Sequence, residues 1–335
     1  MWNLLICQIA IIAFISIQFA PDVRGGERDP MEALMFFEMG GGIEPIHKAV
    51  LEGRERSLER ILKRKADVDL RTNGGATALH MSAWLGDLRM TEMLIDAGAN
   101  VNAVENRGGA PLAFSAAHNA KDVARALLRA GASVNPPASE AGSPLFWAAS
   151  FGDAEFVAML LERGAEVDSK EKGTGSTPLH GAASSGLEPQ KKVQILLAAG
   201  AEPNAEDSSG KTPLHICSDK QVGAILLEGG ANIRSAAQTG STPLHSAVLH
   251  ERTEMVEYLL DRGADPNAND VRGNTALHVV AQYSGRGGLD MAKLLIEAGA
   301  DPRARNHRGQ SPIDEARRAG NRGLLEFLMR HQGRD

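Results

Sequence analysis

The amino-acid sequence predicts an all-α repeat solenoid, in which pairs of helices stack one after another along a single axis. A seven-residue motif, with variants of TPLHxAA, occurs nine times at spacings of 30 to 36 residues that centre on 33. In seven of these units the motif is followed by an apolar run that ends in Gly-Ala or Gly-Gly-Ala. A period of this length is typical of repeat architectures, because each short unit must bury its apolar face against its neighbours. The motifs begin at Glu44, Thr77, Ala110, Ser143, Thr177, Thr212, Thr242, Thr275 and Ser311.

The first helix of each unit is predicted to begin at the motif. A Thr or Ser at the motif start can cap a helix, and the Pro that follows in most units suits the first helical position. The motif leucine and the small residues three and four positions later form one apolar face, as at Leu179, Ala182 and Ala183. The small residues allow neighbouring helices to approach closely.

The second helix of each unit is predicted from a second group of apolar residues at helical spacing. Val256, Leu259 and Leu260 are an example, and Gly263 then supplies a C-terminal cap. In the first unit Lys65 replaces this glycine.

A tight hairpin is predicted between successive units, because glycine stands two residues before the motif in eight of the nine. Ala141 is the exception. With Pro136 and Pro137 nearby, it predicts a distorted hairpin before the fourth unit.

The period and the two landmarks of each unit resemble those of the ankyrin repeat, over nearly all of the chain after Gly42. The resemblance implies two helices and a hairpin per unit, and a concave face that binds a protein partner. We therefore expect an ankyrin-repeat domain of about nine repeats at residues 43–332, after a linker at 26–42 and before a tail at 333–335. The charged first unit and the last unit, where Asp314 replaces the motif histidine, are expected to act as caps.

Three units depart from the regular length. From the motif start to the closing glycine, four complete units have 21 residues, whereas those that begin at Thr177, Thr212 and Thr275 have 23, 18 and 24. We expect insertions at 186–192 and 282–290 to lengthen the turn between helices, and the turn at 219–222 to be shortened. The short sixth unit is expected to bend the solenoid or weaken its stacking.

The N-terminal segment predicts export. Residues 4–20 are apolar except for three polar positions, a length typical of a signal-peptide core, and cleavage after Gly25 would remove residues 1–25. The expected location is then outside the cell or in the periplasm. Two alternatives stay open: an uncleaved membrane anchor, or translation from Met31, which would leave a cytoplasmic protein.

Composition and charge exclude several classes of function. A net charge of −6 argues against a general nucleic-acid binder, because neutralising phosphates requires an excess of Lys and Arg. Cys7 and Cys217 are the two cysteines, and no second Cys lies at a zinc-ligand spacing from Cys217, which we expect to be buried. Neither a P-loop nor a hydrolase or metalloprotease motif occurs. We expect no enzyme activity, no cofactor, no metal and no small-molecule substrate.

The motif histidines are predicted to be structural. Residues one repeat apart lie roughly 8 to 10 Å from each other, too far to share a metal ion. We expect each to hydrogen-bond the motif hydroxyl and nearby backbone. The six are His47, His80, His180, His215, His245 and His278.

The expected partner surface comprises the seventh and eighth residues after each motif start, together with the hairpin tips. Aromatic anchors are enriched at interface hot spots, so Trp84, Phe151 and Tyr283 are the strongest candidates for contact with a partner. The alternative is that these rings only fill gaps between helices. Phe146 and Trp147 are assigned to packing. The candidates are Trp84, Leu85, His118, Phe151, Leu249, His250 and Tyr283 on helices, and Asn106, Arg107, Lys211 and Arg272 at tips.

The last hairpin is locally basic, through Arg303, Arg305, His307 and Arg308. It could meet an acidic partner or a membrane headgroup, or simply carry solvated charges. The function predicted overall is a protein-binding scaffold without nucleic-acid contact, and with membrane contact only if the N-terminal segment is retained. The alternatives are an accessory subunit or effector that delivers or inhibits an enzyme, and a membrane-tethered structural spacer.

Overall fold

The computed structural model describes residues 41–137, 140–283 and 288–331. These residues form eighteen helices in nine successive pairs, with no β-strand among them. The first helices of the pairs are α3 (Pro45–Leu51), α5 (Ala78–Leu85), α7 (Pro111–Ala117), α9 (Pro144–Phe151), α11 (Pro178–Ser184), α13 (Pro213–Ile216), α15 (Pro243–Leu249), α17 (Ala276–Tyr283) and α19 (Pro312–Ala319). The second helices are α4 (Glu55–Lys63), α6 (Leu88–Asp96), α8 (Lys121–Arg129), α10 (Ala154–Glu162), α12 (Pro189–Ala198), α14 (Lys220–Glu228), α16 (Thr253–Asp261), α18 (Gly288–Glu297) and α20 (Arg322–Arg330). The predicted export segment, residues 1–25, and nearly all of the predicted linker lie outside the described residues.

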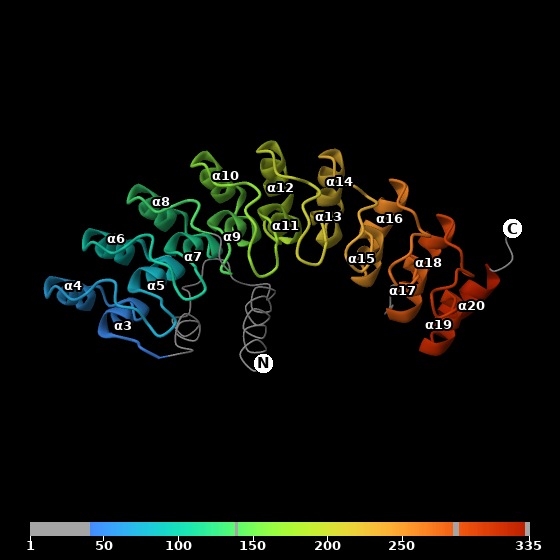
Figure 1. The fold of residues 1–335 in the computed structure, drawn as a ribbon, viewed down its shortest axis with the longest axis horizontal. Helices are drawn as coiled ribbons and strands as arrows, with labels where there is room; N and C mark the ends of the chain where they lie inside the picture. The colour runs from blue at the N-terminus through green and yellow to red at the C-terminus, as the bar shows by residue number, and fades with distance from the viewer. Residues whose placement is uncertain (1–40, 138–139, 284–287, 332–335) are drawn as a thin grey trace.

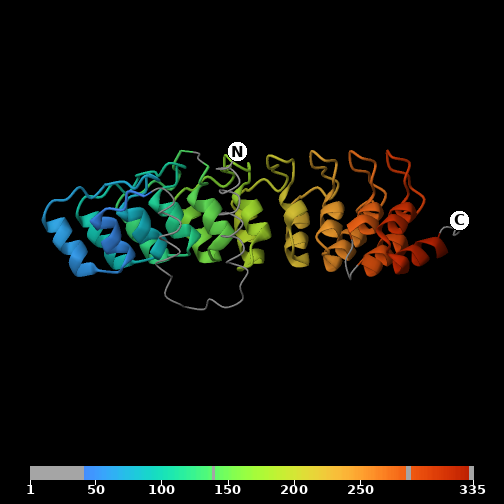
Figure 2. The ribbon, with the colours of Figure 1, turned by 90° about the horizontal axis from the view of Figure 1, so that it is seen from below.

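The helices form two layers along a gentle arc. The first helices line its inner side and the second helices its outer side (Figure 1). Seen from below, the loops between units project as a row from one edge of the helix layers (Figure 2). The predicted all-α solenoid of helix pairs is confirmed.

The core runs continuously between the two layers. Each unit contributes a buried aliphatic motif residue from its first helix, leucine in seven units, such as Leu79, and isoleucine in the first and last, and it adds buried apolar residues from its second helix, such as Leu94. Because burial of each such side chain contributes about 1.5 to 3 kcal/mol, the apolar positions found in the sequence account for the stacking of the units.

The motif histidines fasten each hairpin to the next, as predicted. In the second unit, the Thr77 backbone N–H donates to His80 Nδ1 (3.1 Å), and His80 Nε2 donates to the Gly109 carbonyl of the following loop (3.1 Å). The same arrangement recurs in four later units, while His47 reaches the Leu70 carbonyl. Burial lowers the pKa of all six, that of His80 to about 4. They are therefore neutral hydrogen-bonding groups at neutral pH.

The hairpin before the fourth unit differs from the others, as the sequence indicated. In regular units the positive φ falls on the glycine two residues before the motif, such as Gly108 at 87°, whereas here it falls one residue later, on Gly142 at 75°. The main chain at Ala141 still bonds the preceding loop, with its N–H donating to the Arg107 carbonyl (3.2 Å). The turn has shifted by one residue without leaving the row of loops.

The sixth unit is shortened in its first helix, which corrects the expectation of a shortened turn at 219–222. Helix α13 has four residues where its neighbours α11 and α15 have seven, and α14 begins normally with Asp219 as its N-cap. The guanidinium of Arg252 donates from Nη1 to the carbonyls of Ile216 (3.0 Å) and Cys217 (2.7 Å). The last carbonyls of a helix lack donors inside it. Arg252 therefore supplies the hydrogen-bond donors that the N–H groups of a further helical turn would have provided.

The fifth unit, which carries an insertion, has a lysine at a core position of its second helix. Lys192 lies eight residues before the closing glycine, a place taken by Met90, Phe156 and Met255 in other units, and its side chain is fully buried. Its ammonium donates to the Gly152 carbonyl (2.9 Å) and to Ser185 Oγ (2.6 Å). These bonds tie the longer α11–α12 connection to the end of α9. The insertion in the eighth unit includes residues 284–287, which lie outside the described residues.

The described helices are short: none combines the length and apolar character needed to cross a membrane.

Candidate partner-binding surface

The loop tips form a rigid edge along the solenoid. Neighbouring tips are joined by main-chain hydrogen bonds, such as that from the Asn106 N–H to the Gly74 carbonyl (3.0 Å) and that from the Val271 N–H to the Thr239 carbonyl (2.9 Å). Within a tip, a side chain caps the turn, as where Asp270 Oδ1 accepts the N–H groups of Arg272 and Asn274 (both 2.8 Å). The backbone of this edge is thus held by hydrogen bonds, and several side chains at the tips, such as those of Arg107 and Arg272, are exposed on it.

Trp84 does not lie on this surface. Its side chain is buried, with 6% exposure, and its ring packs against His118 (centroids 3.9 Å apart) and Phe114 (6.0 Å). The structure therefore supports the gap-filling alternative for Trp84, because the ring fills the space between α5 and α7. Leu85 and His118 are half-buried beside it.

Phe151 belongs to an aromatic group on α9. It is half-buried and stacks on Trp147 with centroids 5.4 Å apart, and Trp147 in turn meets Phe146 edge-on at 5.8 Å. Trp147 also donates from Nε1 to the Ala141 carbonyl. Sequence reasoning assigned Phe146 and Trp147 to packing alone, yet both remain half-exposed next to Phe151. The signal was the PLFW sequence in place of PLH, which exchanges the buried histidine for larger rings.

The other helix candidates have different surroundings. Leu249, 50% exposed, and His250, also exposed, lie together at the end of α15. The side chain of Tyr283, at the end of α17, lies outside the described part of the chain. Leu249 is thus the clearest apolar contact point among the predicted helix residues.

Most of the tip candidates are exposed. The side chains of Asn106, Arg107 and Arg272 are exposed and that of Lys211 is half-buried. Asn106 is partly engaged, since its Nδ2 donates to the Asn73 carbonyl (2.9 Å). Val271 lies beside Arg272 at the hairpin tip that the sequence indicated, and its side chain is 60% exposed.

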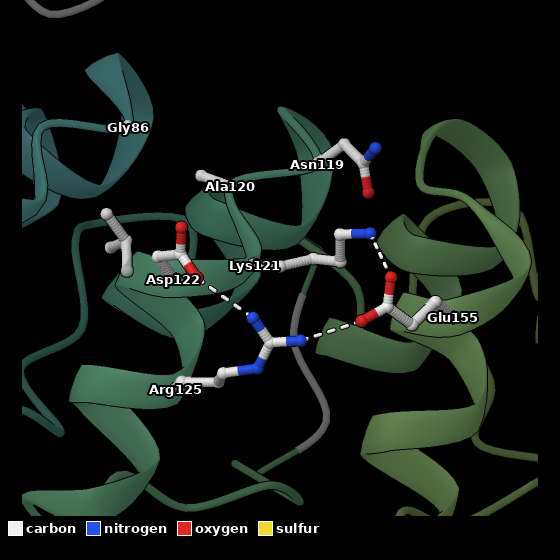
Figure 3. A pocket seen from close by; sticks show the side chains of 8 residues that line it. Gly86, Asn119, Ala120, Lys121, Asp122, Arg125 and Glu155 are labelled. Carbon is white, nitrogen blue, oxygen red and sulfur yellow. Dashed lines mark hydrogen bonds and ion pairs between the residues drawn. The ribbon is translucent and has the colours of Figure 1, made fainter.

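The charged side chains that line the hollow in Figure 3 form ion pairs with one another. The hollow has a volume of about 320 Å³ and lies between α8 and α10 on the outer layer. Lys121 pairs with Glu155 and with Asp153 (2.8 Å), and Arg125 pairs with Asp122 (2.8 Å) and with Glu155 (2.7 Å). Because the cations and carboxylates satisfy one another, the hollow offers no unbalanced group for a ligand. Nor do the described residues contain a group of three His, Cys, Asp or Glu able to hold a metal ion.

Comparison with known proteins agrees with this architecture. A family model described as ankyrin repeats (3 copies) matches residues 46–138, 114–207, 145–235 and 179–270, and a single ankyrin-repeat model matches residues 272–307. Human SH3 and multiple ankyrin repeat domains protein 2 is 33% identical over 114 residues, which cover 33% of this chain and 6% of that protein. Human Rabankyrin-5 is 49% identical over 57 residues, 17% of this chain and 5% of its own length. The E3 ubiquitin-protein ligase KEG of Arabidopsis thaliana is 32% identical over 98 residues, 28% of this chain and 6% of its own.

Each match therefore spans a small part of a much longer relative. The family models, in contrast, cover well over half of this chain and coincide with the observed helix pairs. The chain belongs to the ankyrin-repeat family.

Proposed function

We propose that this protein is a binding scaffold whose partner docks on the concave side, against the loop tips and the ends of the first helices. Ankyrin repeats mediate protein–protein interactions in general, and the relatives share that repeat. The observation that carries the proposal is the row of hydrogen-bonded tips, which holds exposed side chains on a fixed backbone. A partner bound there would meet a surface that is already ordered, so little conformational entropy would be lost on binding.

Contact would be made by the exposed residues rather than by Trp84. Leu249 and Arg107 illustrate the two kinds: an apolar side chain at a helix end and a cation at a tip, both outside the packed core. Phe151 and its neighbours on α9 add aromatic area near the middle of the solenoid. Half-exposed aromatic rings are suited to interface cores, where they contribute large contact area.

The test compares two double variants in the full chain. The first, Leu249→Ser with Arg107→Ser, alters the proposed surface. The second, Met329→Ser with Arg129→Ser, makes the same types of change on the outer helices α20 and α8, and Met329 is 51% exposed against 50% for Leu249. A partner would be captured with the wild-type chain, identified by mass spectrometry, purified and titrated against each variant.

We expect the first variant to weaken binding of the purified partner at least about tenfold, a loss of the size that hot-spot contacts produce, and the second to leave it unchanged. Equal affinity for both variants would place the partner elsewhere on the molecule. Circular dichroism of both variants checks that the fold is kept.

We also propose that residues 1–25 direct export and are removed. The support is the apolar run at 4–20 and the small residue at the expected cleavage point, Gly25. N-terminal sequencing of the protein from its native source tests this. A mature chain starting at Gly26 is expected, and one starting at Met1 or Met31 would reject it.

A further inference from the structure

We propose that the C-terminal tip surface, formed by Val271, Arg272, Arg305, His307 and Arg308, binds an acidic segment of a protein partner. The inference rests on the proposed function, since it assigns one class of ligand to part of the same edge. All five side chains are exposed.

Two neighbouring tips are locked together to form this surface. The His307 N–H donates to the Arg272 carbonyl (2.9 Å), and Asn306 Nδ2 donates to Asn274 Oδ1 (3.0 Å) in a buried position between the tips. Both contacts leave the side chains of Arg272, His307 and Arg308 outside. The cations are therefore presented from a fixed backbone, which reduces the cost of ordering them around a ligand.

The last tip lacks the carboxylate that caps the turn in several of the other tips, and only Thr72 and Ala237 are also uncharged at the equivalent position in the described tips. A carboxylate caps the turn at Glu105, Asp207 and Asp270, where it accepts main-chain N–H groups. In the last tip Asn306 Oδ1 makes the same contacts, to the N–H groups of Arg308 (3.0 Å) and Gln310 (3.1 Å). The geometry of the turn is kept, but the capping group is neutral.

The arginines of this surface also form no direct ion pair among the described residues, and Arg305 interacts with a carboxylate, that of Asp314, only from a longer distance. Arg305 donates to the Gly309 carbonyl, which bears no charge. Among the described residues, no carboxylate lies within ion-pairing distance of Arg272, Arg305 or Arg308. The outer-layer cations Lys121 and Arg125, in contrast, are fully paired. The C-terminal tip surface thus retains its charge for a ligand.

The ligand that fits is an acidic peptide rather than a long polyanion. Val271 is 60% exposed among the cations, and an apolar side chain next to the acidic groups of a peptide would cover it. The chain as a whole has a net charge of −6, which opposes the approach of nucleic acid or of an extended anionic membrane beyond this small surface. Electrostatic complementarity of this kind determines which partner is chosen and how quickly it associates.

The experiment titrates the full-length protein into a fluorescein-labelled peptide of ten glutamates with two central leucines, followed by fluorescence anisotropy. The test variant is Arg272→Gln with Arg308→Gln, which keeps every main-chain bond of the tips. The matched control is Arg129→Gln with Arg163→Gln, two exposed arginines at the ends of outer helices, with the same change of net charge. Circular dichroism confirms that both variants fold.

We expect the wild type and the control to bind the peptide within about twofold of each other, and the test variant at least about tenfold more weakly, with wild-type affinity falling as salt rises. Equal weakening in control and test variants would overturn the inference, because net charge alone would then explain binding. It is also overturned if the wild type ignores the peptide, or if it binds phosphatidylserine vesicles or a single-stranded deoxythymidine 20-mer more tightly than the peptide. In those cases the proposed function is still tested separately, by titrating the captured partner against the double variant Leu249→Ser with Arg107→Ser.

Discussion

Replacing Lys192 with methionine removes an ammonium group from the core between the fourth and fifth units. Methionine occupies the same place in other units, as Met90, Met255 and Met291, each fully or almost fully buried. The variant therefore places an apolar side chain of suitable length at this position and removes an ammonium group that titrates between pH 7 and 11. The difference between the two proteins across this range reports the burial of that one charge.

The magnitude follows from the pKa of the lysine. Burial lowers the pKa of Lys192 from 10.5 to about 8, despite the nearby carboxylates of Asp153 and Glu188. The unfolded chain then holds the proton more tightly than the folded chain, so raising the pH through this window stabilises the folded state. At 1.36 kcal/mol per pKa unit, the wild type should gain about 2 to 3 kcal/mol relative to Lys192→Met between pH 7 and pH 10.

The assay is urea unfolding of both proteins at several pH values from 7 to 10, followed by circular dichroism. Lys191→Met is the control, because Lys191 is adjacent, exposed and paired with Glu188, which raises its pKa instead. We expect the free energy of unfolding of the wild type and of the control to rise in parallel with pH, and that of Lys192→Met to rise by about 2 to 3 kcal/mol less. Three parallel curves would refute the reasoning, since they would mean that the ammonium of Lys192 is as well solvated when folded as when unfolded.

Three further predictions concern residues with defined roles in the fold. Burial depresses the pKa of His80 to about 4, so the folded state loses about 3 kcal/mol from this group as the pH falls from 6.5 towards 4, and acid titration of His80→Gln should show a shallower loss. Arg252→Met should cost about 1 to 3 kcal/mol and accelerate hydrogen exchange of amides at 213–230, because two carbonyls lose their donor, whereas Arg163→Met should not. Trp84→Ala should lower the free energy of unfolding by about 3 to 5 kcal/mol, as measured in urea, against less than about 0.5 for Leu249→Ser, because Trp84 is buried and Leu249 is half exposed.

The predictions that succeeded depend on local chemistry that recurs in each unit. The Thr77 and His80 pair, for example, lies within one turn of helix, so its hydrogen bonds follow from the motif itself. The closing glycines follow equally, since Gly98 and Gly131 adopt φ near 90°, a conformation that favours glycine. Repetition along the chain made these local rules visible without any structure.

The prediction that Trp84 lies on the partner surface was wrong, because the exposure of this side chain depends on contacts between units, which the motif alone does not determine. Trp84 and Phe151 occupy equivalent or adjacent positions in the repeat, yet one ring is buried against His118 and the other stacks within its own helix on Trp147. The burial of Trp84 depends on Phe114 and His118, which belong to the next unit. Exposure at such a position is a property of two neighbouring repeats, and a single motif does not contain it.

When the units are aligned on their motifs and closing glycines, two positions stand out because their charge differs from that of the equivalent residues in other units. At the Lys192 position other units have apolar residues, and at the Asn306 position several units have carboxylates. In both places the backbone is kept and only the charge changes. In the core, the added charge is compensated by hydrogen bonds to Gly152 and Ser185. At the tip, the lost carboxylate is not compensated within the described residues, so the arginines around it retain an attraction that a second molecule can satisfy.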